Sequence, residues 1–375
     1  MNMNRKIFTF RLLVALASVS AFSQQFTLAV LPDTQPYINH DAQKGVWGYP
    51  INQLDMFTAQ IEYLLDNARV AGGTIDFLVH EGDVVEHRTL YSSEWKNADK
   101  LLSKLDGIIP YLIAPGNHDC DRWVMKKGQP IQCHGWKTFC KYFGPDSVHF
   151  KDCSWYGGSF NGGTNSWAVQ NISGYQVLFL ALEVEPTDET LAWAQSVLDL
   201  NKGLPTIIVT HEYLEYGTND PNNPSYLNFA NSRNRRDEGG NSPEAMWNTF
   251  IRKNDQIFMV LCGHSSGEGI RIDRNVYGHN VYAILSDYQG RREVINSVAS
   301  ARNPLDSGDG WLRLMHFDIA NSSVHVQTYS PYLDRYETDA DSDFTISFDF
   351  DWKKRFPAAN LQYLRSSFMK FVPTF

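Results

Sequence analysis

Positive charge is scarce in this sequence of 375 residues. It has 33 lysines and arginines against 42 aspartates and glutamates, so its formal net charge at pH 7 is −9. That balance argues against a protein that neutralises nucleic-acid phosphates with basic side chains, and we expect no nucleic-acid-binding surface. An acidic protein can still act on anionic substrates if bound metal ions supply the positive charge.

Long apolar runs and internal repeats are also lacking. No segment is both long and apolar enough to cross a bilayer, so we expect no transmembrane anchor. The composition is 43% hydrophobic, 20% charged and 13% aromatic, which is typical of a globular protein. It excludes collagen-like, coiled-coil and wholly disordered chains.

The first 23 residues have the pattern of a signal peptide. A basic start at Arg5 and Lys6 precedes a short apolar run over residues 12–17, and the small residues Ala21 and Ser23 place a cut before residue 24. We therefore predict export, to the periplasm or as a secreted protein. The main domain is predicted over residues 24–335, followed by a C-terminal extension, 336–375, without an assigned role. A buried N-terminal helix is the alternative for residues 1–23.

Cysteine is rare, and four of the five cysteines lie close together in the chain. In an exported protein such a cluster favours two disulfide bonds, and the sequence leaves three connectivities open. We place them in an insertion over about residues 120–165. The alternative is a zinc site that uses His134 or His149, although no Cys-x-x-Cys spacing supports it. Cys262 lies in an apolar run and is predicted to be buried. The clustered residues are Cys120, Cys133, Cys140 and Cys153.

Short apolar runs alternate with amphipathic segments, which is typical of an α/β protein. Helices are predicted over residues 54–68, 189–200 and 243–253. The predicted strands cover residues 26–31, 75–80, 111–114, 177–184, 206–210, 257–262, 281–285, 312–317 and 324–329.

Five of these strands are followed by side chains that can bind metal. Because ligands in open α/β sheets gather beyond the carboxyl ends of strands, we expect these side chains to meet at one edge. Each short motif is uninformative alone, but their order along the chain is a strong signal. In chain order they are Asp33-Thr34-Gln35, Gly82-Asp83, Gly116-Asn117-His118-Asp119, His211 and Gly263-His264.

This set of motifs resembles the calcineurin-like metallophosphoesterases. Their pattern is Asp-x-His, Gly-Asp, Gly-Asn-His-Asp/Glu, a single His and Gly-His-x-His. The resemblance implies an α/β fold with two facing mixed β-sheets flanked by helices, a four-layer sandwich with a two-metal centre at one end. The chain is also similar to an exported bacterial branch of the family, through Tyr288-Gln289 and residues 329–332.

The resemblance also implies a role for each motif residue. Asp83 would bridge two divalent ions (Mn, Fe, Zn or Mg), and Asn117, His211 and His264 would complete one metal position. His118 would act as the general acid or orient the phosphate, with Asp119 fixing its tautomer.

The other metal position departs from the family pattern. Asp33 is retained, but Gln35 and Ser266 stand where the pattern has histidine. Their neutral oxygens are weaker ligands than imidazole, so we expect this position to bind metal more weakly and to prefer Mn²⁺, Mg²⁺ or Ca²⁺ over Zn²⁺. Three residues are considered as replacements: Glu268, His80 and His87.

The predicted function is hydrolysis of phosphate monoesters or diesters in a small phosphorylated substrate, with a metal-bound hydroxide as the nucleophile. One alternative is a non-catalytic or single-metal binding protein on the same fold. Another is a serine esterase, because residues 263–267 match Gly-x-Ser-x-Gly with Ser265 as the nucleophile. That motif requires a helix directly after the serine, and the polar stretch at 268–275 does not predict one. The sequence leaves the identity of the substrate and the oligomeric state open.

Overall fold

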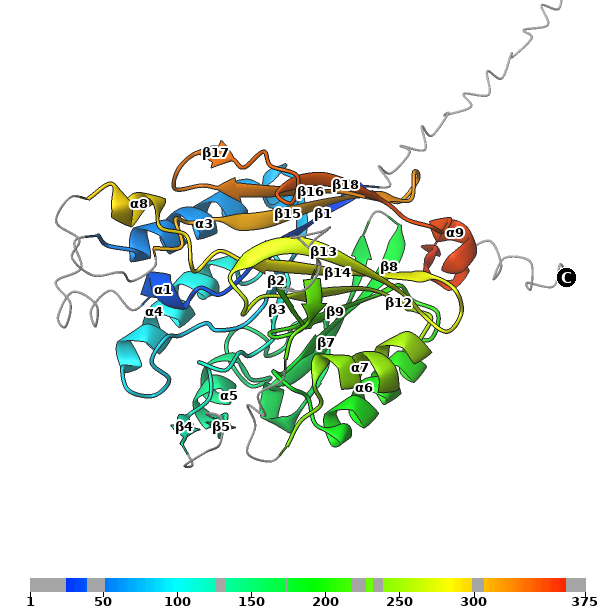
Figure 1. Ribbon diagram of the computed structural model, residues 1–375, viewed down its shortest axis with the longest axis horizontal. Coiled ribbons are helices and arrows are strands. Elements are labelled where there is room, and N and C mark those ends of the chain that lie inside the picture. The colour runs from blue at the N-terminus through cyan, green and yellow to red at the C-terminus, as the bar shows by residue number, and fades with distance from the viewer. Residues whose placement is uncertain are drawn as a thin grey trace, which may run out of the picture.

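The computed structural model describes residues 25–38, 51–125, 132–172, 174–216, 227–231, 239–298 and 307–361. The predicted signal peptide, residues 1–23, lies outside them. Two large β-sheets lie one above the other, with helices on the outside (Figure 1). Among the helices in the described ranges, none combines the length and apolar character needed to cross a membrane.

The first sheet has seven strands in the order β17-β16-β15-β1-β2-β3, with β18 also paired to β16. β1 runs parallel to β2 and antiparallel to β15, so the sheet is mixed. Its strands are β1 (Gln25–Leu31), β2 (Ile75–His80), β3 (Tyr111–Ile113), β15 (Leu312–Asp318), β16 (Ser323–Ser330), β17 (Arg335–Tyr336) and β18 (Asp343–Ser347).

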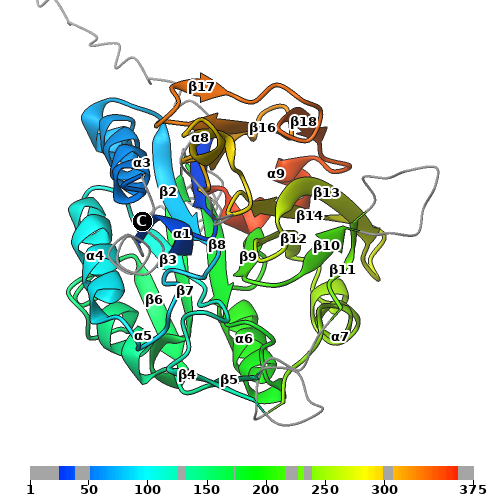
Figure 2. The same ribbon diagram turned by 60° about the vertical axis from the view of Figure 1, so that its left-hand side comes forward.

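The second sheet also has seven strands, in the order β13-β14-β12-β9-β8-β7-β6. Its centre, from β14 to β8, is parallel, and both edges are antiparallel. Its strands are β6 (Tyr156–Phe160), β7 (Asn165–Ile172), β8 (Tyr175–Leu182), β9 (Thr206–Thr210), β12 (Ile257–Cys262), β13 (Gly267–Arg274) and β14 (Asn280–Asp287). Two short ribbons lie outside both sheets (Figure 2): β4 (Arg122–Val124) with β5 (Gln132–His134), and β10 (Leu214–Tyr216) with β11 (Leu227–Phe229).

The first sheet is covered on both faces because the side chains on both faces of its strands are apolar. Successive strand side chains point to opposite faces, and here both kinds are apolar. Phe77 and Val79 of β2 belong to the core shared with the second sheet, whereas Leu78 belongs to a second core under the helices. The ring of Phe77 stacks on that of Phe179 in β8, with centroids 4.1 Å apart. The two sheets therefore face each other across one apolar layer.

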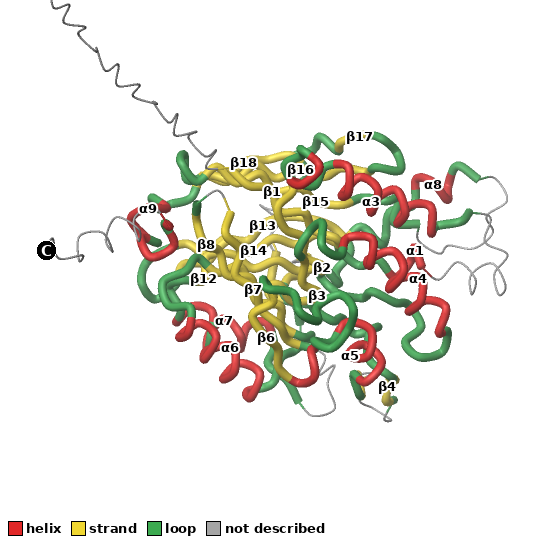
Figure 3. Tube along the Cα trace, turned by 180° about the vertical axis from the view of Figure 1, so that it is seen from behind, coloured by secondary structure: helices red, strands yellow, loops and turns green. Residues whose placement is uncertain are grey.

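Helices form the two outer layers. α3 (Leu54–Asp66) and α4 (Ser92–Leu102) cover the outer face of the first sheet, and α6 (Asp188–Leu200) and α7 (Pro243–Thr249) lie beyond the second (Figures 1 and 3). The predicted class, two facing mixed sheets flanked by helices, is confirmed. The shorter helices are α1 (Gln35–Ile38), α5 (Lys137–Phe143), α8 (Glu293–Asn296) and α9 (Trp352–Arg355).

The segment after residue 335 continues the same structure as far as it is described, to residue 361. β18 pairs with β16, and the aromatic side chains that follow it pack into the core between the sheets. These are Phe348, Phe350, Trp352 and Phe356. The sequence alone assigned no role to this segment, although its apolar residues alternate with polar ones from Phe344 to Trp352; in the structure it closes one end of the sandwich.

Candidate metal centre

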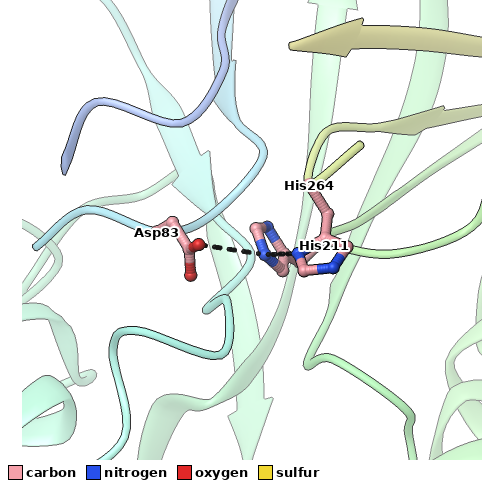
Figure 4. A group of neighbouring side chains, drawn as sticks. All are labelled: Asp83, His211 and His264. Carbon is pink, nitrogen blue, oxygen red and sulfur yellow. Dashed lines mark hydrogen bonds and ion pairs between the residues drawn. The ribbon is translucent and has the colours of Figure 1, made fainter. Parts of the chain in front are cut away.

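Four predicted ligands from both sheets meet at one end of the sandwich. Asp83 and Asn117 follow β2 and β3 of the first sheet, and His211 and His264 follow β9 and β12 of the second. The Nε2 atom of His211 lies 3.3 Å from Asp83 Oδ2, 3.1 Å from Asn117 Oδ1 and 3.1 Å from His264 Nδ1. Figure 4 shows Asp83 and the two histidines facing one another.

The three distances from His211 Nε2 fit ligands of a single cation. Ligand atoms bonded to one metal at about 2.1 Å lie roughly 3.0 to 3.4 Å apart, depending on the coordination geometry. The Nδ1 atom of His211 hydrogen-bonds the carbonyl oxygen of Glu81 at 2.9 Å. Because a carbonyl only accepts, Nδ1 carries the proton and the Nε2 lone pair points into the group. His264 Nε2 lies 3.6 Å from the Glu212 carboxylate, which favours a proton on Nε2. The other ring nitrogen of His264, Nδ1, then faces the group with its lone pair.

Two of the ligands, Asn117 and His264, follow a glycine. At each glycine, the space that a side chain would occupy is filled by a carboxylate from another strand end. A Cβ atom at Gly116 would lie 2.2 Å from Asp83 Oδ1, and one at Gly263 would lie 2.0 Å from Asp33 Oδ2. Any larger residue would therefore push a carboxylate out of place. The glycines of Gly-Asn-His-Asp and Gly-His are thus part of how the centre is assembled.

The second predicted position is only partly formed by the expected residues. Asp33 Oδ2 accepts the backbone N–H of His264 at 3.1 Å, and Gln35 Nε2 donates to Asp83 Oδ2 at 3.3 Å. Both side chains are almost completely buried. Ser266, however, is exposed, and its hydroxyl lies against Gly290, where an added Cβ would be 3.0 Å away. The structure therefore brings Asp33 and Gln35 to the centre, whereas Ser266 lies at the surface beside Gly290.

Two residues that were not predicted as ligands extend this group, because Gln289 contacts Gln35 and Asp287 contacts Gln289. Gln289 Oε1 accepts from Gln35 Nε2 at 2.6 Å, and Gln289 Nε2 donates to Asp287 Oδ2 at 2.8 Å. Asp287 ends β14, the parallel neighbour of β12. The strand-end rule that selected the other ligands would have selected Asp287 as well, had β14 been predicted to extend to residue 287.

Buried carboxyl groups dominate the electrostatics of the site. Burial raises the pKa of Asp33 well above its usual value, and the charge of Asp287 raises it further. Burial also raises the pKa of Asp287, to about 6. Burial acts in the same direction on Asp83, but the charges of His211 and His118 outweigh it and lower the pKa of that group. Carboxylates buried in this way favour a bound cation, whose charge stabilises the ionised form.

His118 lies beside the group, but Asp119 does not orient it as we expected. The ring Nδ1 hydrogen-bonds the carbonyl oxygen of Glu86 at 2.6 Å, which places a proton on Nδ1 and leaves Nε2 as the ring nitrogen that can take up or release a proton. The carboxylate of Asp119 instead accepts the backbone N–H groups of Gly116 at 2.8 Å and Val85 at 3.1 Å. The predicted role of Asp119 is therefore corrected: its side chain is turned into the protein, where it joins the loops after β2 and β3.

The three proposed replacement ligands are engaged elsewhere. His80 is fully buried and hydrogen-bonds the Thr34 hydroxyl, and burial lowers its pKa to about 3. His87 lies 2.7 Å from Glu94 Oε1. Glu268 forms an ion pair with the buried guanidinium of Arg313. All three have structural partners rather than places in the metal centre.

The serine-esterase alternative is wrong. The residues after Ser265 form strand β13, which pairs antiparallel with β14, so the chain runs strand, turn, strand. A nucleophile elbow needs a helix at that point to present the serine.

The predicted disulfide bonds stay a prediction, because the structure carries all five cysteines as thiols. The Sγ atoms of Cys120 and Cys133 both lie 3.4 Å from the carbonyl oxygen of Asn117, so this pair is close together. Cys140 and Cys153 contact different carbonyls, those of Asn161 and His149. Within the described ranges these cysteines form no cluster with His134 or His149 that could hold zinc.

Several known proteins are similar to this chain. Residues 26–268 match the sequence profile of the calcineurin-like phosphoesterases. Over 337 residues the chain is 30% identical to the uncharacterized protein YvnB of Bacillus subtilis (strain 168), an alignment that covers 86% of this chain and 22% of that protein. The chain thus spans less than a quarter of the length of this relative.

Two solved structures are similar at lower identity. A dimetal phosphatase from Danio rerio is 12% identical with a TM-score of 0.49, covering 86% of this chain and 99% of that one. A protein serine/threonine phosphatase from Saccharomyces cerevisiae is 13% identical with a TM-score of 0.29, covering 85% and 82%.

The profile covers well over half of the chain and includes every strand-end motif from Asp33 to His264. The chain therefore belongs to the calcineurin-like phosphoesterase family.

Proposed function

We propose that this chain is a metal-dependent hydrolase of phosphate monoesters or diesters that works with two divalent cations. The observation that carries the proposal is that Asp83, Asn117 and His264 each place a ligand atom within 3.3 Å of His211 Nε2, from four strand ends in two sheets. The family to which the chain belongs supports the reaction class.

Each side chain has a definite task in this reaction. Asp83, Asn117, His211 and His264 would hold one cation, and Asp33 with Gln35 would contribute to the second. Bound cations of this kind lower the pKa of water and offset the charge of the phosphoryl group. His118, held through Nδ1 by the Glu86 carbonyl, presents Nε2 to exchange a proton with the leaving oxygen. The substrate would be a small phosphorylated molecule.

A metal-removal experiment tests the proposal directly. Purified protein is treated with a chelator, dialysed and assayed on an aryl phosphate monoester and on a bis-aryl phosphate diester, before and after Mn²⁺ is restored. We expect hydrolysis to disappear and then to return with Mn²⁺, because no side chain at the site replaces the cation. Hydrolysis that is unaffected by both steps would contradict the proposal.

A non-catalytic or single-metal protein is the second candidate, favoured by Gln35 and by the exposed position of Ser266. It differs in two measurable ways: elemental analysis would find about one metal per chain, and neither substrate would be hydrolysed. Two bound metals with turnover would exclude it.

We also propose export, on the pattern of residues 1–23. Expression of the full chain in a bacterial host followed by fractionation should place the protein outside the cytoplasm. N-terminal sequencing of the product should begin at Gln24. A cytoplasmic product that retains residue 1 would overturn this part of the proposal.

A further inference from the structure

The second metal position lacks both histidines of the family pattern, yet the structure surrounds it with buried oxygen atoms. Asp33 is 1% exposed and Gln35 is 2% exposed. Among the described residues, Asp33 Oδ1 and Gln35 Oε1 are buried oxygens that accept no hydrogen bond. An unsatisfied buried acceptor costs about 1 to 3 kcal/mol, so two of them at one place indicate a missing partner.

The position of the Gln35 amide shows where that partner would lie. Its Nε2 atom lies 3.3 Å from Asp83 Oδ2 and 2.6 Å from Gln289 Oε1. The unsatisfied Oε1 belongs to the same amide group, so it lies close to these contacts with Asp83 and Gln289. A cation bound by Oε1 would therefore lie near the Asp83 carboxylate, which the family pattern also assigns to the other metal.

A third carboxylate, that of Asp287, is joined to this group through Gln289. Asp287 is 1% exposed, and its two oxygens accept the backbone N–H and the side-chain amide of Gln289, both at 2.8 Å. Ser286, the residue before Asp287, lies close to Asp33, and Gly263 shows this. A Cβ atom at Gly263 would lie 2.0 Å from Asp33 Oδ2 and 3.5 Å from the Ser286 carbonyl oxygen. Asp287 therefore enters the centre from β14, next to the β12 strand that carries His264.

We propose that Asp287 is a ligand of the second cation, together with Asp33, Gln35 and the shared Asp83, and that Gln289 positions Asp287. This inference rests on the proposed function, since it assigns residues within the same centre. The donor atoms are all oxygen, from carboxylates and an amide, and such a set selects a hard cation such as Mn²⁺ or Mg²⁺. The other position keeps two imidazole nitrogens, so the two sites differ in chemistry.

The test is the binding of Mn²⁺ alone to the wild type and to Asp287→Asn, which keeps the shape of the side chain and removes its charge. The matched control is Asp199→Asn, at an exposed position near the end of α6. Bound manganese is counted by elemental analysis, and its electron paramagnetic resonance spectrum reports whether two ions are magnetically coupled. We expect about two ions with a coupled spectrum in the wild type and the control, and about one uncoupled ion in Asp287→Asn.

Failure of this inference and failure of the proposed function give different results. If Asp287→Asn keeps both ions and the coupled spectrum, Asp287 is no ligand, while the two-metal centre stands. If the wild type itself binds no manganese, the proposed function fails as well.

A second variant covers the case in which Asp287→Asn does not fold. Gln289→Met removes the amide that holds Asp287 and leaves the carboxylate in place. It should weaken binding of the second ion alone, by roughly 10-fold to 100-fold in dissociation constant, as expected when a metal ligand loses the hydrogen bond that holds it. Unchanged binding of both ions in a folded Gln289→Met variant would overturn the positioning role.

Discussion

Three residues at the centre have an uncommon backbone conformation. Asp33, Asp83 and His264 have φ values of 37°, 49° and 69°, in the region that favours glycine. A side-chain-bearing residue there costs on the order of 1 to 3 kcal/mol and persists only where its surroundings fix it. Here the fixing contacts are among the site residues themselves, since Asp33 accepts the backbone N–H of His264 at 3.1 Å and Asp83 that of His118 at 2.7 Å. The strain is consistent with a centre that is held ready for metal before metal arrives.

His118 yields a prediction that separates catalysis from metal binding. Replacement by glutamine should lower kcat by about 10²- to 10⁴-fold, the usual contribution of a general acid, and leave the manganese content unchanged. The loss should shrink on aryl phosphates whose leaving group has a low pKa, because such a group departs without a proton. Steady-state kinetics over a series of aryl phosphates measures both effects.

His279→Gln is the matched control for this series. His279 pairs with Asp255 at 2.8 Å and lies just before β14, at the end of that strand away from Asp287. Its kinetics should equal those of the wild type. A loss in His118→Gln that is the same for good and poor leaving groups, or that comes with loss of manganese, would count against the general-acid role.

At the scale of secondary-structure elements, one buried histidine ties a helix to a strand. His149 Nε2 lies 3.0 Å from Asp99 Oδ1 in α4, and its Nδ1 lies 2.7 Å from the Tyr111 hydroxyl at the start of β3 and 3.1 Å from Asp106 Oδ1. Burial lowers the pKa of His149, but the hydrogen bonds and charges of Asp106 and Asp99 outweigh it, so the net shift of its pKa is upward.

This pKa shift predicts a pH dependence of stability. Because the folded protein binds this proton more tightly than the unfolded chain, the contribution is complete below the ordinary histidine pKa of about 6.5. It is lost as the pH rises through the higher pKa of the folded state. Urea unfolding of the wild type and His149→Gln from pH 6 to pH 9 should therefore show the largest difference in unfolding free energy at pH 6. A difference that stays constant or grows with pH would contradict this assignment.

The elements also show how far the sequence could predict the site. Asp33, Asp83, Asn117, His211 and His264 were predictable because each follows a strand with a continuous apolar run, and such runs reveal a buried strand and its end. Asp287 was missed because the apolar run of β14 stops at Leu285, although the strand continues for two more residues. Asp119 was assigned wrongly because side-chain direction in a loop depends on which backbone groups need partners, and sequence spacing does not show this.

The same reasoning applies to the fold. Both sheets were predictable from their buried central strands and from the resemblance, but edge strands were not. β13 and β18 are half-exposed and each carries only two large apolar side chains, Ile270 with Ile272 and Phe344 with Ile346. Their place is decided by pairing with β14 and β16, which is a tertiary effect that a local pattern does not contain.

At the scale of the whole molecule, the C-terminal segment supports the strand that carries His264. Trp352, 1% exposed, packs edge-on against Phe258 of β12 with ring centroids 5.1 Å apart. Phe350 and Phe356 contact the same two rings. This aromatic group lies towards the amino end of β12, and His264 follows its carboxyl end. One strand thus connects the C-terminal segment to the metal centre.

This arrangement predicts that the segment is required for global stability. Trp352→Ala would leave a cavity in the core and should lower the free energy of unfolding by about 3 to 5 kcal/mol. Lys353→Ala, one residue further along and exposed, should change it by less than about 0.5 kcal/mol. Urea denaturation followed by tryptophan fluorescence and circular dichroism gives both values. Below its unfolding transition, Trp352→Ala should still bind the wild-type amount of manganese, because the cavity lies at the opposite end of β12. Equal unfolding midpoints for the two variants would show that the segment lies on the sandwich without supporting it.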